Sequence, residues 1–311
     1  MPQNIAIIDL GTNTFNLLIA TVSEHNTTIV HTTKQAVQLG KSTIGQNIIN
    51  SEAQHRAIKA LQYFVLKCKE YKVTSINAFA TSAVRTATNC TEFCKAVKAT
   101  TNIDIQVIDG LQEAEYIYQG VRKAVNMPIT SNTLIMDIGG GSTEFIICNS
   151  TAVLWKQSYN IGIARLLAKF EPQEILTSNQ KETILQYLKE QLTTLTEAIH
   201  LHQPTTLIGS SGSFDTFADM LLLAQYQPIL TPTQTNYTFD IADLKQLFTT
   251  LYTSTYAQRL AINGMLALRA EMIVLAALCT EYIIDEYNFE HMQLSTYALK
   301  EGVLFSSVLA K

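Results

Sequence analysis

Two stretches, 5–22 (IAIIDLGTNTFNLLIATV) and 134–149 (LIMDIGGGSTEFIICN), match each other at a constant offset of 128 residues. Each consists of an apolar run, an aspartate, a turn of small residues and a second apolar run. The aspartates are Asp9 and Asp137, and the first turn glycines are Gly11 and Gly139. This pattern predicts a β-hairpin in each half of the chain. Because the runs are apolar on both faces, we expect their strands inside sheets that helices cover.

A hairpin that recurs in both halves predicts two similar α/β domains. Strand and helix patterns alternate after each hairpin. In the first half we expect helices over 51–71, with Ser51 as the N-cap, over 82–100 and over 111–125, and strands over 75–81 and 105–110. In the second half we expect one long helix near 180–200 and a strand, turn and helix over 206–220. Proline and polar residues near 126–132 predict the boundary there. The expected domains are residues 1–126 and 127–297, with a C-terminal helix, about 298–311, as a candidate addition to the first.

Composition restricts the class of protein. The chain has 311 residues, of which 47% are hydrophobic and 15% charged, which indicates a globular fold. The N-terminus does not resemble a signal peptide, and the apolar segment 272–279 is too short to span a membrane. Five cysteines without metal-type spacing indicate free thiols in a reducing cytoplasm. We therefore expect a cytoplasmic protein without membrane or nucleic-acid partners; a homodimer remains open.

The hairpin turns are candidate phosphate sites. Successive N–H groups in a tight turn form a concavity that binds anions, and glycine allows close approach. The candidate ligands are Gly11, Thr12, Asn13 and Thr14 in the first turn and Gly139, Gly140, Gly141 and Ser142 in the second. The segment 209–212 follows a strand and opens a helix, so Gly209, Ser211 and Gly212 are further candidates. A plain strand-to-helix turn explains that last segment equally well.

Three carboxylates lie in or beside the turns: Asp9, Asp137 and Glu144. Carboxylates beside an anion site require a cation between them, and hard oxygen ligands suit Mg²⁺ or Mn²⁺. For Asp9, a hydrogen bond to its own turn is an alternative. Arg85 is expected in the first turn of a helix, where the dipole disfavours a cation, so a bound phosphate would explain it; a surface salt bridge is the alternative. By sequence alone, Glu113 is an ordinary helix-start glutamate.

The motifs DLGTNTFNLLI, FATSAVRTATN, VIDGLQEAEYIYQGV, MDIGGGSTEFII and LIGSSGSFDTFADM occur in the order and approximate spacing of a known family. The chain resembles the exopolyphosphatase/guanosine-pentaphosphate phosphatase (Ppx/GppA) family, in a short two-domain form. The resemblance implies two RNase H-like domains of the actin-like ATPase superfamily, with an active-site cleft between them. It also implies that Glu113 is the catalytic base, that Asn13 and Arg85 bind phosphate, and that Glu144 lies near the metal. Two positions depart from the family pattern, Gln112 beside the base and Lys300 near the C-terminus.

The resemblance implies metal-dependent hydrolysis of the terminal phosphoryl group of inorganic polyphosphate. Guanosine pentaphosphate is the alternative substrate, and the motifs do not decide between the two. A small-molecule kinase of the same superfamily would share both glycine turns. A non-catalytic protein that binds a guanosine polyphosphate would need no catalytic base, so the full set of Glu113, Asp137 and Glu144 favours an enzyme.

Overall fold

The computed structural model describes residues 2–24, 26–40 and 47–309, with side chains up to residue 306. It divides into two compact domains, residues 1–120 with 299–311 and residues 121–298. The division lies inside one helix, α5 (Gly110–Ala124).

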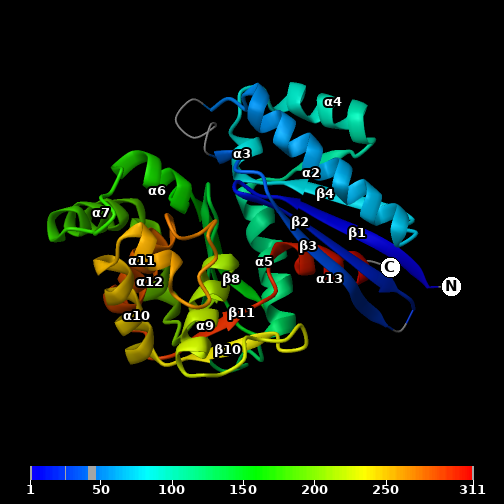
Figure 1. The fold of residues 1–311 in the computed structure, drawn as a ribbon. Coiled ribbons are helices and arrows are strands. Elements are labelled where there is room, and N and C mark those ends of the chain that lie inside the picture. Colours follow the sequence, from blue (N-terminus) through cyan, green and yellow to red (C-terminus); the bar gives the residue numbers. More distant parts are fainter. Residues whose placement is uncertain (1, 25, 41–46, 310–311) are drawn as a thin grey trace. The chain divides into compact units, whose positions relative to one another are not determined.

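The first domain contains a five-stranded sheet in the order β3-β2-β1-β4-β5 (Figure 1). The first three strands are antiparallel, and β4 and β5 run parallel to β1. Its strands are β1 (Gln3–Leu10), β2 (Thr14–Val22), β3 (Thr27–Ala36), β4 (Ser75–Ala80) and β5 (Ile105–Val107). Its helices are α2 (Ser51–Glu70), α3 (Ser82–Arg85), α4 (Cys90–Thr101), the first part of α5, and α13 (Leu299–Leu309).

Figure 1 shows α2 and α4 on one face of this sheet and α13 on the other. Buried residues recur along α2 at helical spacing, and they form its contact with the sheet: Ala53, Ala57, Ala60, Leu61, Phe64 and Cys68. The N-cap of α2 is Asn50, because its side chain accepts a hydrogen bond from the N–H of Ala53 at 2.9 Å. The prediction of Ser51 was wrong by one residue, since Ser51 is already helical.

The single helix expected over 82–100 is also wrong. The chain forms two helices, α3 and α4, with residues 86–89 between them. Asn89 Oδ1 accepts the N–H of Ile49 at 2.9 Å, and Asn89 Nδ2 donates to the carbonyl of Ile49 at 2.8 Å. This tertiary contact fixes the break.

The second domain repeats the first with one strand added. Its sheet order is β10-β11-β9-β6-β7-β8, in which β9 and β11 run parallel to β6. Its strands are β6 (Thr133–Ile138), β7 (Thr143–Cys148), β8 (Val153–Tyr159), β9 (Thr206–Ser210), β10 (Asn236–Phe239) and β11 (Met292–Ser295). Its helices are the end of α5, α6 (Ile163–Phe170), α7 (Ser178–Gln191), α8 (Thr193–His202), α9 (Gly212–Ala224), α10 (Ile241–Thr253), α11 (Tyr256–Leu260) and α12 (Ile273–Glu286). The expected helix over 180–200 is thus two helices, broken at Leu192, which leaves helical geometry at φ −103° and ψ 20°.

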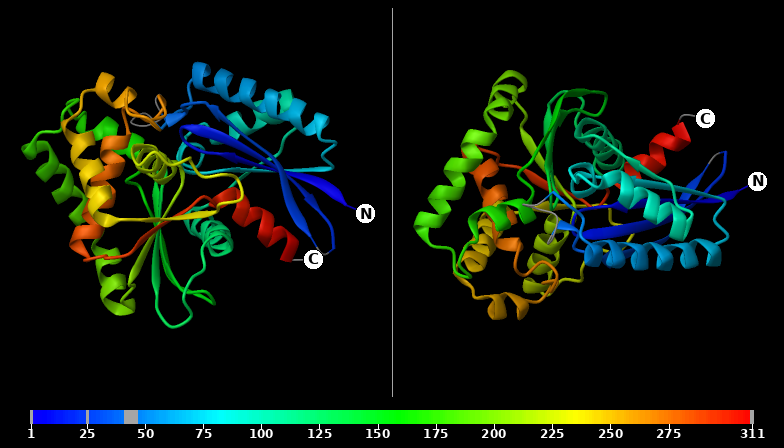
Figure 2. Two further views of the ribbon diagram at one scale, coloured as in Figure 1. Left: turned by 60° about the horizontal axis from the view of Figure 1, so that its bottom comes forward. Right: turned by 90° about the horizontal axis from the view of Figure 1, so that it is seen from above.

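Every residue of β6 and β7 is buried, as their two-sided apolar sequences predict. The helices α7, α9, α10 and α12 gather on one face of the sheet (Figure 2). Eleven of the 14 residues of α12 are buried, so the apolar segment 272–279 lies in a core helix. Across the described ranges, no helix is both long enough and apolar enough to cross a bilayer.

Candidate active site

The first hairpin turn joins β1 to β2. The N–H of Gly11 donates to the carbonyl of Thr14 at 3.1 Å, and a Cβ on Gly11 would lie 2.8 Å from that oxygen. The carbonyl of Thr12 accepts the N–H of Gly40, and the carbonyl of Asn13 accepts the N–H groups of residues 37 and 38. In a trans peptide the N–H points opposite to the C=O. The N–H groups of Asn13 and Thr14 therefore point away from these contacts, as an anion site requires.

The second turn joins β6 to β7 with the same geometry. The N–H of Gly139 donates to Ser142 at 3.0 Å, and a Cβ on Gly139 would again lie 2.8 Å from the carbonyl oxygen. The carbonyls of Gly139 and Gly140 accept the first N–H groups of α6, at 3.0 Å and 2.9 Å. The carbonyl of Gly141 accepts from Arg165 Nε at 2.7 Å. Three consecutive N–H groups, those of Gly140, Gly141 and Ser142, thus point away from α6.

Asp137 and Glu144 are directly opposite each other on β6 and β7. Both are buried, at 7% and 1% exposure. Ser210 Oγ donates to Asp137 Oδ2 at 2.5 Å, and Ser158 Oγ donates to Glu144 Oε1 at 2.6 Å. Two buried carboxylates side by side are costly unless donors or a cation balance them. Their oxygen donors have the chemistry that a divalent cation prefers.

The position that corresponds to Glu144 in the first domain is Asn16. It is opposite Asp9, and Asn16 Nδ2 donates to Asp9 Oδ2 at 3.0 Å. Desolvation raises the pKa of Asp9 to about 6; the bond from Asn16 and the charge of Lys300 act in the other direction, and the charge of Glu301 adds to the rise. Lys300 itself pairs with the buried Glu301 at 2.7 Å.

The three predicted metal ligands belong to two different domains. Within the described ranges, no group of three or more His, Cys, Asp or Glu residues is placed to hold a metal ion. Asp137 and Glu144 are adjacent, whereas Asp9 belongs to the first domain.

Arg85 and Glu113 form a half-buried ion pair, with Nη1 2.8 Å from Oε2 and side chains 20% and 10% exposed. The same Nη1 donates to the carbonyl of Ile108 at 3.0 Å. Glu113 lies in the first turn of α5, where Asp109 Oδ1 accepts the N–H of Gln112 at 2.8 Å. Arg85 is the last residue of the four-residue α3, so it lies in the first turn of a helix as expected, but that helix ends with it. No hydrogen bond from its Nη2 or Nε to another described residue is seen, and these donors remain for an anion.

The segment 209–212 has contacts that explain its residues without a ligand. Gly209 belongs to β9, and a Cβ there would collide with the ring of Phe214. Ser211 has φ +73° and donates its hydroxyl to the carbonyl of Ile138 at 2.7 Å. The carbonyl of Gly212 accepts from the guanidinium of Arg269. Phosphate binding by this segment stays a prediction.

Sequence reasoning missed the residues that support the two turns. Asn16 could have been found, since it stands 128 residues before Glu144. Ser158 carries no local signal, because its strand reaches Glu144 only through the fold. Ser210 lies in the segment 209–212, but its bond to Asp137 depends on the pairing of β9 with β6. Gly162 caps α6 and packs against the backbone of the second turn.

Known proteins match this chain over nearly its full length. The model of the Ppx/GppA phosphatase family matches residues 18–311. A Haemophilus influenzae protein provisionally named exopolyphosphatase is 27% identical over 304 residues, covering 98% of this chain and 91% of that protein. The crystal structure of an exopolyphosphatase from Cytophaga hutchinsonii has 40% identity and a TM-score of 0.96, covering 99% of this chain and 98% of that one.

The fold alone is also shared with an Aquifex aeolicus Ppx/GppA family member, at 24% identity and a TM-score of 0.81, over 100% of this chain and 99% of that one. These matches confirm the predicted pair of α/β domains and the predicted family. The chain therefore belongs to the Ppx/GppA phosphatase family.

Proposed function

We propose that this phosphatase hydrolyses the terminal phosphoryl group of inorganic polyphosphate with the help of a divalent cation. The observation that carries the proposal is the Arg85–Glu113 pair, a carboxylate and a guanidinium 2.8 Å apart at the start of α5. Hydrolysis needs a group that accepts a proton from water and a cation that binds the phosphoryl oxygens. The pair offers both.

In the proposed reaction, Glu113 orients a water molecule and accepts its proton as the water oxygen bonds to the terminal phosphorus. The bridging P–O bond breaks, and the shortened chain leaves with the negative charge. The remaining donors of Arg85 and the N–H groups of the first turn stabilise the charge that spreads over the phosphoryl oxygens. Asp137 and Glu144 would hold Mg²⁺ or Mn²⁺, which would neutralise charge on the phosphate chain.

The test is phosphate release by the purified Glu113→Gln variant. We expect a loss of turnover of about 100- to 10,000-fold, because the amide cannot accept the proton, with substrate affinity changed only a few-fold. Glu115→Gln is the matched control, since it makes the same change two residues along the same helix. Near-normal turnover by Glu113→Gln would remove Glu113 from the mechanism.

The same phosphate-release assay identifies the preferred substrate. Long polyphosphate, short polyphosphate, guanosine pentaphosphate and ATP are compared at equal concentrations of terminal phosphoryl groups. Activity that disappears with a chelator and returns with Mg²⁺ or Mn²⁺ would support the metal. Phosphate transfer from ATP to an added acceptor, instead of release, would indicate a kinase.

A further inference from the structure

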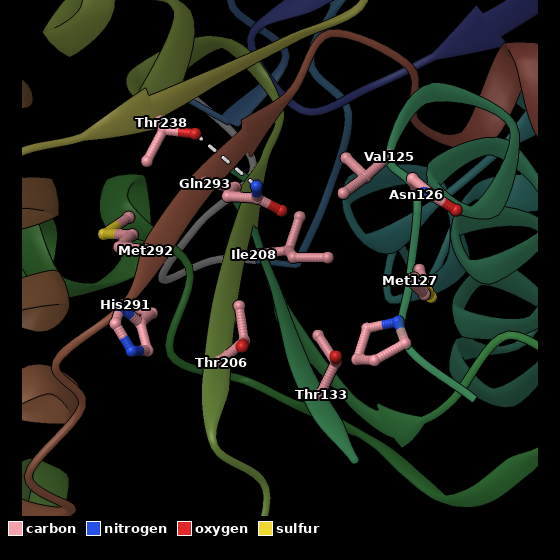
Figure 3. Close-up of a pocket in the computed structure, with 11 residues that line it drawn as sticks. Val125, Asn126, Met127, Thr133, Thr206, Ile208, Thr238, His291, Met292 and Gln293 are labelled. Atoms are coloured by element: carbon pink, nitrogen blue, oxygen red, sulfur yellow. Dashed lines mark hydrogen bonds between the residues drawn. The ribbon is translucent and has the colours of Figure 1, made fainter. Parts of the chain in front are cut away.

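A cavity of about 250 Å³ lies in the second domain, between its sheet and the segment that follows α5. Figure 3 shows the strand residues on one side and Val125, Asn126 and Met127 on the other. The strand residues are Thr133, Thr206, Ile208, Thr238, Met292 and Gln293. The lining combines apolar side chains with hydroxyls and amides, and His291 is its one ionisable residue among those described.

Thr133 gives this cavity an unused hydroxyl. The residue is 0% exposed, and its Oγ1 has no hydrogen-bond partner among the described residues. A buried hydroxyl without a partner destabilises the folded state, so it needs an explanation. A ligand that reaches into the cavity would satisfy it.

A second cavity of about 390 Å³ adjoins the first, because both are lined by Val125, Asn126 and Met127. It is lined as well by Arg122, Lys123, Ser150 and Asn236. Ser150 Oγ is a second buried hydroxyl without a partner among the described residues. None of the described residues that line either cavity is acidic, so the basic end attracts anions.

We propose that the two cavities bind one nucleoside phosphate, with its base in the neutral cavity and its phosphate beside Arg122 and Lys123. The amide of Asn126 presents a donor beside an acceptor, which matches the edge of a heterocyclic base. Gln293 Nε2 donates one N–H to Thr238 Oγ1 at 3.5 Å (Figure 3), so its carbonyl and its second N–H would face the base. Met127 and Ile208 provide apolar contact for the faces of the ring. Cavities of this size hold a base and a sugar phosphate, but not a long polymer.

This site is separate from the phosphate turns. Thr133 and Asp137 lie on the same face of β6 and four residues apart, which is about 13 Å along a strand. Thr206 pairs with Thr133, and Ser210 pairs with Asp137. The two sites thus occupy opposite ends of the same two strands.

The test is calorimetric titration of the full-length protein with GMP and AMP, with guanosine and inorganic phosphate as partial ligands. A nucleoside monophosphate has no phosphoanhydride bond, so the proposed hydrolysis does not consume it. We expect at least one nucleotide to bind more tightly than either partial ligand. Thr133→Val should weaken nucleotide binding roughly 3- to 10-fold without loss of stability, because the hydroxyl has no partner in the protein.

Thr280→Val is the matched control: Thr280 is equally buried, but its hydroxyl bonds the carbonyl of Ala276 inside α12. It should leave nucleotide affinity unchanged. Lys123→Ala should weaken binding of the nucleotide and not of guanosine. Arg85→Ala should retain nucleotide binding, which separates this site from the hydrolytic one. Equal affinity for phosphate and nucleotide, or no effect of Thr133→Val, would overturn the proposal.

Discussion

At the scale of single residues, the two hairpins differ most at the position opposite the aspartate. Glu144 faces Asp137, whereas Asn16 faces Asp9. An amide donates a hydrogen bond and carries no charge, so Asp9 needs no cation to balance a neighbour. Two adjacent carboxylates repel each other, and a divalent cation relieves that repulsion. Of the two hairpins, the second therefore fits the proposed cation better.

Asp9 makes stability depend on pH. Its pKa rises from 3.8 to about 6, mainly through desolvation, so the folded state keeps a proton that the unfolded state loses. Stability should fall as pH rises from about 4 to 6 and then stay level. In the Asp9→Asn variant this fall should be absent, and at pH 7.5 in chelator the variant should be more stable than the wild type. The gain is at most about 3 kcal/mol, and less because Asp9 is partly exposed.

Urea unfolding of the first domain at several pH values between about 3.5 and 8 measures this difference. Asn16→Ala should raise the pKa of Asp9 further instead of removing the titrating group. It removes the hydrogen bond that lowers the pKa of Asp9. Its stability should fall over a higher pH range than that of the wild type. A constant difference between Asp9→Asn and wild type at all pH values would contradict the assignment.

At the scale of elements, the N-terminus of α6 fixes the second turn. Gly162 packs so closely that a Cβ would overlap the backbone of residues 140–142. Backbone cannot rotate away as a side chain can, so Gly162→Ala should displace the turn. We expect a loss of kcat/KM of at least tenfold in phosphate release, and a destabilisation of about 1–3 kcal/mol.

The control for Gly162→Ala is a variant that loses stability without changing the turn. Leu188→Ala truncates a side chain of α7 that is 1% exposed, which costs about 2–5 kcal/mol. Per folded molecule, its activity should equal that of the wild type. If both variants lost activity in proportion to stability alone, the turn would have no special role.

The sequence predicted most elements but not their interruptions. The hairpins, β4 and α5 follow from apolar periodicity. The break between α3 and α4 depends on Asn89 meeting Ile49, which lies 40 residues away. The break at Leu192 was likewise not predicted, because no glycine or proline lies there in the sequence. Local patterns cannot report contacts between residues distant in sequence.

At the scale of the whole molecule, the repeat predicted two domains. It also predicted some residues of the candidate site but not others. The turns, Asp9 and Asp137 are visible in the sequence, because each lies within a single hairpin. The pairing of Arg85 with Glu113 is not visible, since the two are 28 residues apart and meet only after β5 and α5 form. The same holds for Ser210 and Asp137, which are 73 residues apart.

The first domain also depends on the far end of the chain. Leu299, Val303 and Leu304 of α13 are buried, and a Cβ on Gly302 would overlap the carbonyl of Tyr116 in α5. Burial of three such side chains contributes roughly 5 kcal/mol, which is comparable to the net stability of a domain. Truncation after Ala298 should therefore destabilise residues 1–120.

Hydrogen exchange read by segment measures this effect. After truncation, the amides of β1 and β2 should exchange much faster, because α13 contacts both strands. A chain shortened only by residues 310–311 is the control for truncation itself. Gly302→Val should accelerate exchange in the same strands, since it forces α13 away from α5 while every other side chain remains. Unchanged protection of β1 and β2 in both the truncated chain and Gly302→Val would show that the first domain is stable without this helix.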